Sequence, residues 1–278
     1  MHIGFLEFLG YGFIQRALIA GSFIGLICSI LGVVLVLRRL SLIGDGLSHV
    51  TFGGVALGLF LNVYPLYVSL PVVVCSSLGI LRLADRARMY GDAAIGIVSS
   101  VGIAVGVMLA SIGGGFNIDL FSYLFGNILS ISGTEVAASI VLSVLVLATV
   151  AFYFNEILSI TFDEEFARAS GIDADRINAI LVILTGITVV LTMKVVGIML
   201  TSALLILPAA TAFQFARGFR NAMAISAVTS VISVLCGITA SVVLNLPTGA
   251  SIVLLNACFF LAAFLYKRFS GRRSLPAA

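Results

Sequence analysis

The chain has 278 residues, of which 61% are hydrophobic and only 10% are charged, whereas soluble domains are roughly 45 to 50% apolar and about 25% charged. A mean hydropathy of +1.23 excludes a water-soluble fold, and the net charge of +3 is no evidence for a nucleic-acid partner, because its meaning depends on which side of a membrane the charges occupy. Lipid cannot hydrogen-bond exposed backbone groups, so the composition predicts an all-α, polytopic membrane protein. We expect one membrane-spanning domain over 1–278, with room for eight to ten spans.

Nine apolar stretches bounded by charged residues, Pro or Gly are predicted to cross the membrane. They lie at about 13–37, 41–62, 66–84, 93–111, 135–153, 177–194, 196–215, 222–244 and 249–266. The only breaks between 177 and 215 are Lys194, Gly197 and Pro208, and a discontinuous helix has the same pattern. The sequence is therefore compatible with two topologies: nine full spans, or eight full spans and a broken one.

Basic residues near span ends are retained in the cytoplasm, which orients the chain. If the 38–40 loop lies inside, thirteen of the 15 basic residues fall inside and only Arg16 and Lys194 fall outside. The thirteen are Arg38, Arg39, Arg82, Arg86, Arg88, Arg168, Arg176, Arg217, Arg220, Lys267, Arg268, Arg272 and Arg273. An odd number of crossings preserves this split, so we expect an inner or plasma membrane protein with an external N-terminus and a cytoplasmic C-terminus.

Two longer loops interrupt the spans. The external loop, 112–134, contains an apolar stretch over 121–131 that is too short to cross, so it predicts an interfacial or re-entrant helix. The cytoplasmic loop, 154–176, is the most polar part of the chain. Its segment over 162–171 predicts a short amphipathic helix with two phenylalanines at i, i+4 and a glycine at its end. The residues concerned are Phe162, Asp163, Glu164, Glu165, Phe166, Arg168 and Gly171.

Asp45 and His49 lie inside an otherwise apolar predicted span. A buried ionisable group costs roughly 2.5 to 3.5 kcal/mol at a helix centre, so it usually faces a partner or an aqueous cavity. Their i, i+4 spacing puts both side chains on one helix face, where a carboxylate and an imidazole suit zinc, manganese or ferrous iron. The alternative is a pair that hydrogen-bonds to itself and ties down the helix start near Arg39. Zinc prefers about four ligands, which two copies of the chain on a two-fold axis would supply.

The sequence lacks the residue patterns typical of a disulfide framework, an ATP site or a metalloprotease. The four cysteines, Cys28, Cys75, Cys236 and Cys258, lie in apolar runs without a CxxC pair and are predicted to be small buried hydrophobes, not a disulfide framework or metal site. No Gly-Lys dipeptide occurs, so a P-loop and an ATP site are excluded. The only other histidine, His2, is terminal, which excludes an HExxH protease and makes intramembrane hydrolysis a weaker hypothesis than transport.

Four ordered stretches resemble the ABC-3 family of permeases from zinc, manganese and iron ABC importers. They are LVLRRLSLIGDGLSHVTFGGVALG at 35–58, IDLFSYLFGNILSIS at 118–132, FDEEFARASGI at 162–172 and MKVVGIMLTSALLILPAATA at 193–212. The resemblance covers about 13–267 and implies a type II ABC importer-like permease. Family permeases carry an Asp and a His at the positions of Asp45 and His49, which the resemblance implies are metal ligands.

The resemblance also implies partners: a second copy of the chain, two cytoplasmic ATPase subunits and an external solute-binding protein. It implies that the segment around 162–171 is the coupling helix that docks on the ATPase. The stretch TMKVVG at 192–197 resembles zinc permeases more than manganese permeases, so we expect transported Zn²⁺, with Mn²⁺ or Fe²⁺ as alternatives and no permanently bound cofactor. A proton-coupled secondary transporter using Asp45 and His49 is the alternative from another class, and it would leave the polar helix without a role.

Overall fold

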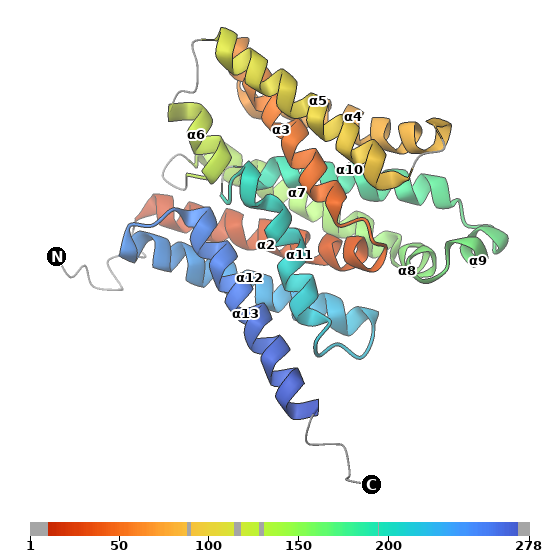
Figure 1. The fold of residues 1–278 in the computed structure, drawn as a ribbon. Helices are drawn as coiled ribbons and strands as arrows, with labels where there is room; N and C mark the ends of the chain where they lie inside the picture. The colour runs from red at the N-terminus through yellow and green to blue at the C-terminus, as the bar shows by residue number, and fades with distance from the viewer. Residues whose placement is uncertain (1–10, 88–89, 114–117, 128–130, 194, 272–278) are drawn as a thin grey trace.

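The computed structural model describes residues 11–87, 90–113, 118–127, 131–193 and 195–271, and it is built from helices and turns (Figure 1). In these segments eight helices are long and apolar enough to cross a membrane. They are α2 (Gly12–Leu37), α3 (Leu42–Phe60), α4 (Pro65–Ala87), α5 (Gly91–Ile112), α7 (Gly133–Phe152), α10 (Ala174–Thr192), α12 (Phe219–Leu244) and α13 (Thr248–Gly271). Shorter segments join them: α6 (Ile118–Phe125), α8 (Phe154–Phe162), α9 (Glu164–Ala169), the 3-10 turn η2 (Ile198–Leu200) and α11 (Thr201–Ala212).

Most successive long helices run in opposite directions, but α11 makes a short ninth pass between α10 and α12, so these two long helices run in the same direction (Figure 1). In Figure 1 α8 and α9 lie at the right, whereas α6 and the start of α2 lie at the left. We call these the basic end and the α6 end, because most of the described basic residues belong to helix ends on the right. At the basic end lie Arg38, Arg39, Arg82, Arg86, Arg168, Arg176, Arg217 and Arg220. Lys267 and Arg268 belong to the C-terminal turns of α13, which point to the bottom of Figure 1, and Arg16 lies near the start of α2. Eight of the predicted spans agree with helices to within about five residues, and the prediction of an all-α polytopic protein is confirmed.

The predicted span 196–215 is the exception, since its helix is only Thr201–Ala212. The chain between α10 and η2 crosses the segment that ends α6, and Gly197 (φ 93°) and Gly126 (φ 78°) meet there in left-handed conformations. A Cβ on Gly197 would lie 2.4 Å from the Leu124 carbonyl oxygen, so only glycine fits both the backbone conformation and the close approach. The broken-helix alternative is therefore the one that the structure has.

Helices α2, α3 and α10 form the buried centre, and α4 and α5 cover one side of α3. Helix α3 approaches α5 closely because both carry glycine at the crossing: a Cβ on Gly53 would lie 2.7 Å from the Gly102 carbonyl oxygen. Small residues allow this backbone-to-backbone contact, which is a common way to pack helices in lipid. The result is a tight three-helix unit, α3–α4–α5, beside the rest of the bundle.

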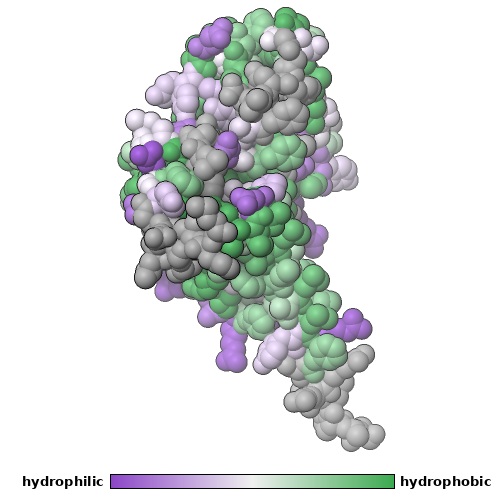
Figure 2. Space-filling model, turned by 90° about the vertical axis from the view of Figure 1, so that its left-hand side faces the viewer, coloured by the Kyte–Doolittle hydropathy of each residue, from purple (hydrophilic) through white to green (hydrophobic). Residues whose placement is uncertain are grey.

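Hydrophobic side chains cover much of the outer surface, as a lipid environment requires. Figure 2 shows them along the projecting lower part of the molecule. Helix α13 exposes Leu254, Leu261 and Phe264. This arrangement corrects the prediction for the cysteines: Cys28 is buried, but Cys75, Cys236 and Cys258 are exposed on the outside of their helices, and all four are free. Because lipid is as apolar as a protein interior, an apolar run need not be buried in protein.

The short helix predicted over 121–131 is shifted toward the N-terminus. Helix α6 covers Ile118–Phe125 and ends where Gly126 turns into the left-handed region. Residues 114–117 and 128–130 lie outside the described part of the chain. An eight-residue helix is too short to span a bilayer, in agreement with the prediction that this loop does not cross.

Candidate metal site on α3 and its connection to α9

Asp45 and His49 project from one face of α3, close to its first turn. The Asp45 Oδ2 and His49 Nε2 atoms lie 3.6 Å apart, and the two side chains are 49% and 26% exposed in the isolated chain. The intervening residues Gly46, Leu47 and Ser48 are buried. The pair therefore points away from the core of its own chain.

The neighbours of α3 define where this face lies. A Cβ on Gly46 would meet Ile95 of α5, and one on Gly44 would meet Leu205 of α11. Since successive residues are 100° apart on a helix, Asp45 and His49 lie between the α5 and α11 contacts. The two side chains are thus partly exposed between these two packed seams.

The separation of 3.6 Å is longer than a hydrogen bond but within the distance of an ion pair, so the two side chains face each other without a direct hydrogen bond. Within the described residues, no group of three or more His, Cys, Asp or Glu side chains could hold a metal ion. The described residues thus offer two ligand atoms here, one oxygen and one nitrogen. A four-ligand site needs further donors.

The polar loop differs from its prediction in one respect. A single helix over 162–171 is wrong, because Asp163 is extended (φ −152°, ψ 98°) and separates α8, which ends at Phe162, from α9. The Asp163 carboxylate instead caps α9 by accepting a hydrogen bond of 2.9 Å from the Phe166 amide. Phe162 and Phe166 are still both exposed, at 69% and 67%, and the glycine turn predicted at Gly171 is confirmed by its φ of 87°.

Helix α9 is fixed to the ends of α2 and α10 by a network of charged groups. Arg38 donates to the Glu164 Oε2 atom at 2.6 Å and also to the Asn178 side-chain oxygen, and Asn178 donates to Glu164 at 3.4 Å. Arg168 donates to Glu164 at 3.0 Å and to Asp175 at 2.5 Å. Burial lowers the pKa of Arg38 and the adjacent Glu164 counteracts it, whereas hydrogen bonds from Arg168 to Asp175 and Glu164 raise the pKa of Arg168.

The network lies close in the chain to the candidate metal site. Arg38 is the C-cap of α2, its side chain is only 9% exposed, and residues 39–41 alone separate it from α3. Arg39 makes the turn with a φ of 58°. Sequence reasoning missed Arg38, Asn178 and Asp175 as parts of this unit, because the first is far from the others in the chain. The one available signal was a polar Asn178 in the first part of a predicted span.

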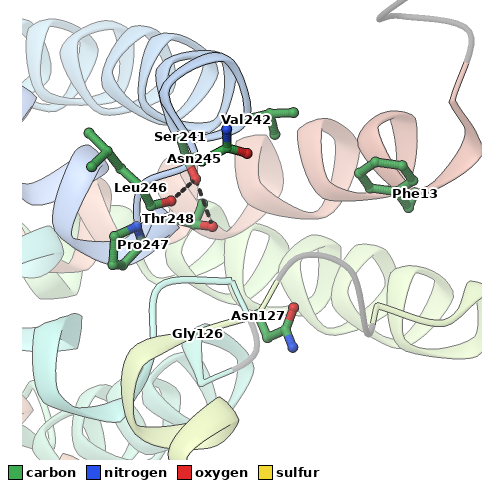
Figure 3. Close-up of a pocket in the computed structure, with 9 residues that line it drawn as sticks. All are labelled: Phe13, Gly126, Asn127, Ser241, Val242, Asn245, Leu246, Pro247 and Thr248. Carbon is green, nitrogen blue, oxygen red and sulfur yellow. Dashed lines mark hydrogen bonds between the residues drawn. The ribbon is translucent and has the colours of Figure 1, made fainter.

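A separate cavity of about 330 Å³ opens at the α6 end (Figure 3). Its lining comes from the turn between α12 and α13, from Gly126 and Asn127 after α6, and from Phe13. The Ser241 hydroxyl donates to the Leu246 carbonyl at 2.5 Å and lies 3.2 Å from the Thr248 hydroxyl. The lining side chains are neutral, so this cavity lacks the anionic donors that a divalent cation prefers.

These features define a polytopic membrane protein that carries a carboxylate–imidazole pair within a helix bundle and a fixed polar helix at one end. Residues 10–267 match the ABC 3 transport family, and the chain belongs to this family. It is 32% identical to the manganese transport system membrane protein MntC of Halalkalibacterium halodurans over 96% of this chain and 91% of that protein. It is 33% identical to the high-affinity zinc uptake system membrane protein ZnuB of Haemophilus influenzae over 91% of this chain and 96% of that protein.

A solved structure has the same fold. The structure of PsaBC from Streptococcus pneumoniae in complex with Fab superposes with a TM-score of 0.84 at 30% identity, and covers 94% of this chain and 95% of that chain. The agreement extends over nearly the whole bundle.

Proposed function

We propose that this chain is the permease subunit of an ATP-driven importer for a divalent transition-metal ion, and that Asp45 and His49 are ligands for the ion in transit. The observation that carries this proposal is the pair itself: an oxygen and a nitrogen donor 3.6 Å apart on one face of a membrane helix. Relatives that are named for manganese and zinc transport support the class of cargo. They do not choose between the metals.

Zinc is the ion that the donor set favours. Two copies of the chain, related by a two-fold axis, would bring together two carboxylates and two imidazoles, a four-donor set of the kind that tetrahedral zinc accepts. Manganese prefers more oxygen donors and higher coordination. The partial exposure of both side chains in one isolated chain supports a site that a second copy completes.

ATP hydrolysis would be carried out by a separate cytoplasmic subunit, and α9 offers a surface for it. Exposed Phe162 and Phe166 can enter an apolar groove on that partner. Because Glu164 of α9 binds Arg38 at the end of α2, a movement of α9 would pull on the turn that leads into α3. Thus Asp163, Glu165 and Gly171 shape the docking element, while Glu164 and Arg168 anchor it to the spans.

The alternative, a proton-coupled secondary transporter, uses the same Asp45–His49 pair without a partner ATPase. It explains neither the exposed phenylalanines nor the attachment of α9 to α2. The two functions differ in a measurable way, since only the ABC importer stops when the partner ATPase is inactive.

The test is uptake by vesicles that contain the chain, its co-purified ATPase and a zinc-loaded solute-binding protein. We expect zinc uptake to require ATP and to be inhibited weakly by manganese. Uptake that persists with a hydrolysis-deficient ATPase would refute the ABC importer. Equal or better uptake of manganese would refute the assignment of zinc as the transported ion, but not the assignment of the chain as an importer permease.

A further inference from the structure

A crevice of about 270 Å³ opens on the outer surface where α4 and α5 meet over α3. Buried Val50 and Gly53 of α3 form its floor, and its sides are Val72 and Ser76 of α4 and the exposed Val101 and Val105 of α5. Of the eight long helices, α4 and α5 are the least covered by the rest of the chain. The crevice is almost wholly apolar, so in a bilayer it faces hydrocarbon.

A second, shallow hollow, formed by α4 alone and open to the surroundings, lies on the last turns of α4. It is lined by Gly79, Leu83 and Ala87 and by two exposed guanidinium groups, Arg82 and Arg86. Gly79 contributes open space, since a Cβ there would meet no atom within 4 Å. The hollow thus combines an apolar base with two positive charges at the basic end.

The two hollows lie along one face of α4. Positions 72, 76, 79, 83 and 86 follow helical spacing on a single stripe. At 1.5 Å per residue, the stripe from Val72 to Arg86 is about 21 Å long. One leaflet of a hydrocarbon core is about 15 Å thick, so the stripe reaches from the middle of the bilayer to the level of its head groups.

We propose that this stripe binds one anionic phospholipid from the leaflet at the basic end. An acyl chain lies in the crevice between α4 and α5, and the phosphate lies between Arg82 and Arg86. Guanidinium groups bind phosphate oxygens in bidentate fashion. The apolar crevice can bind an acyl chain, which a phospholipid has and a free phosphate ion lacks. The lipid chain would contact α3 at Val50 and Gly53, directly after His49.

Native mass spectrometry of the full chain in detergent tests the proposal, with phosphatidylglycerol and phosphatidylcholine of the same acyl chains as probes. Arg82→Gln with Arg86→Gln should weaken phosphatidylglycerol binding about 30-fold, given the contribution of each basic residue near an anionic lipid surface. The matched control, Lys267→Gln with Arg268→Gln, removes the same charge from the C-terminal turns of α13 and should leave binding unchanged. Wild-type protein should prefer phosphatidylglycerol over phosphatidylcholine.

A second variant tests the shape of the site with both arginines kept. Gly79→Leu fills open space, so it should fold normally, shown by an unchanged elution volume, and should lose the bound lipid. The proposal is overturned if the arginine variant loses no more than its α13 control, or if Gly79→Leu retains the lipid. It is also overturned if inorganic phosphate displaces the lipid at equal concentration. A disulfide between copies of Val101→Cys in native membranes would show that a second copy of this chain covers the crevice, and that result too would overturn it.

Discussion

The ion pair between Arg38 and Glu164 allows a quantitative test of how α9 is held. Glu164→Gln keeps the size of the side chain and removes its charge. Arg38, with 9% of its side chain exposed, would then keep only a neutral partner at Glu164 and the Asn178 oxygen. Removing one partner of a buried charged pair destabilises because the remaining charge is left poorly compensated.

The size of the effect follows from exposure. A fully buried pair would cost 3 to 5 kcal/mol on loss of one partner, by order of magnitude, but Glu164 is 35% exposed and water replaces part of the interaction. A hydrogen bond to a charged group contributes roughly 1.5 to 3 kcal/mol, so we expect a loss of about 2 kcal/mol. For a chain of this length that corresponds to roughly 4 to 8 °C in Tm.

Thermal unfolding of the purified chain in detergent measures this loss. Glu165→Gln is the matched control, because Glu165 is the exposed neighbour on α9 and the structure gives it no ion pair within the described residues. A cycle with Arg38→Met isolates the pairwise contribution, which should be at least about 1 kcal/mol. If Glu164→Gln lowers Tm no more than Glu165→Gln does, the pair does not fix α9 and the proposed route from α9 to α3 is refuted.

Three further predictions concern transport and topology. Asp45→Asn or His49→Ala should reduce metal uptake to background while membrane insertion and ATPase co-purification are retained, and normal uptake by both variants would remove the pair from the site. Phe166→Asp should release the ATPase or uncouple ATP hydrolysis from uptake, measured as ATP consumed per ion, and unchanged coupling would exclude α9 as the docking element. In a cysteine-free background, a membrane-impermeant thiol reagent should label Leu246→Cys but not Glu165→Cys in intact cells, and the opposite pattern would invert the topology.

Most of the fold could be predicted from the sequence because each long helix must be continuous and apolar to cross lipid. The exception, Thr201–Ala212, shows the limit of that reasoning. The break beside Gly197 depends on a tertiary contact, since the close approach of the Leu124 carbonyl leaves room only for glycine. Hydropathy reports the polarity of a segment and not its neighbours, so it joined the turn and the short helix into one span.

The candidate site could be predicted in part for the same reason. Asp45 and His49 are polar residues in an apolar run, and their i, i+4 spacing alone placed them on one face, as the structure has them. The break at Asp163 was missed because the Asp163 carboxylate accepts a local hydrogen bond from the Phe166 amide. Such a cap competes with continuation of the helix, and charge patterning does not reveal it. The partnership of Arg38 with Glu164 and Asn178 joins residues more than a hundred positions apart, which no spacing rule can detect.

The contacts of α3 indicate how a movement of α9 would change the proposed metal site. Helix α3 meets α5 backbone to backbone, since a Cβ on Gly102 would lie 2.9 Å from the Val50 Cα, and such a contact resists sliding. Its contact with α11 is softer, because a Cβ on Gly44 would meet only the end of the Leu205 side chain. A displacement of the α2–α3 turn would therefore move α3, α4 and α5 together and open or close the seam with α11. Asp45 and His49 lie beside that seam, so their exposure would change in the same movement, and with it the affinity of the proposed site for an ion.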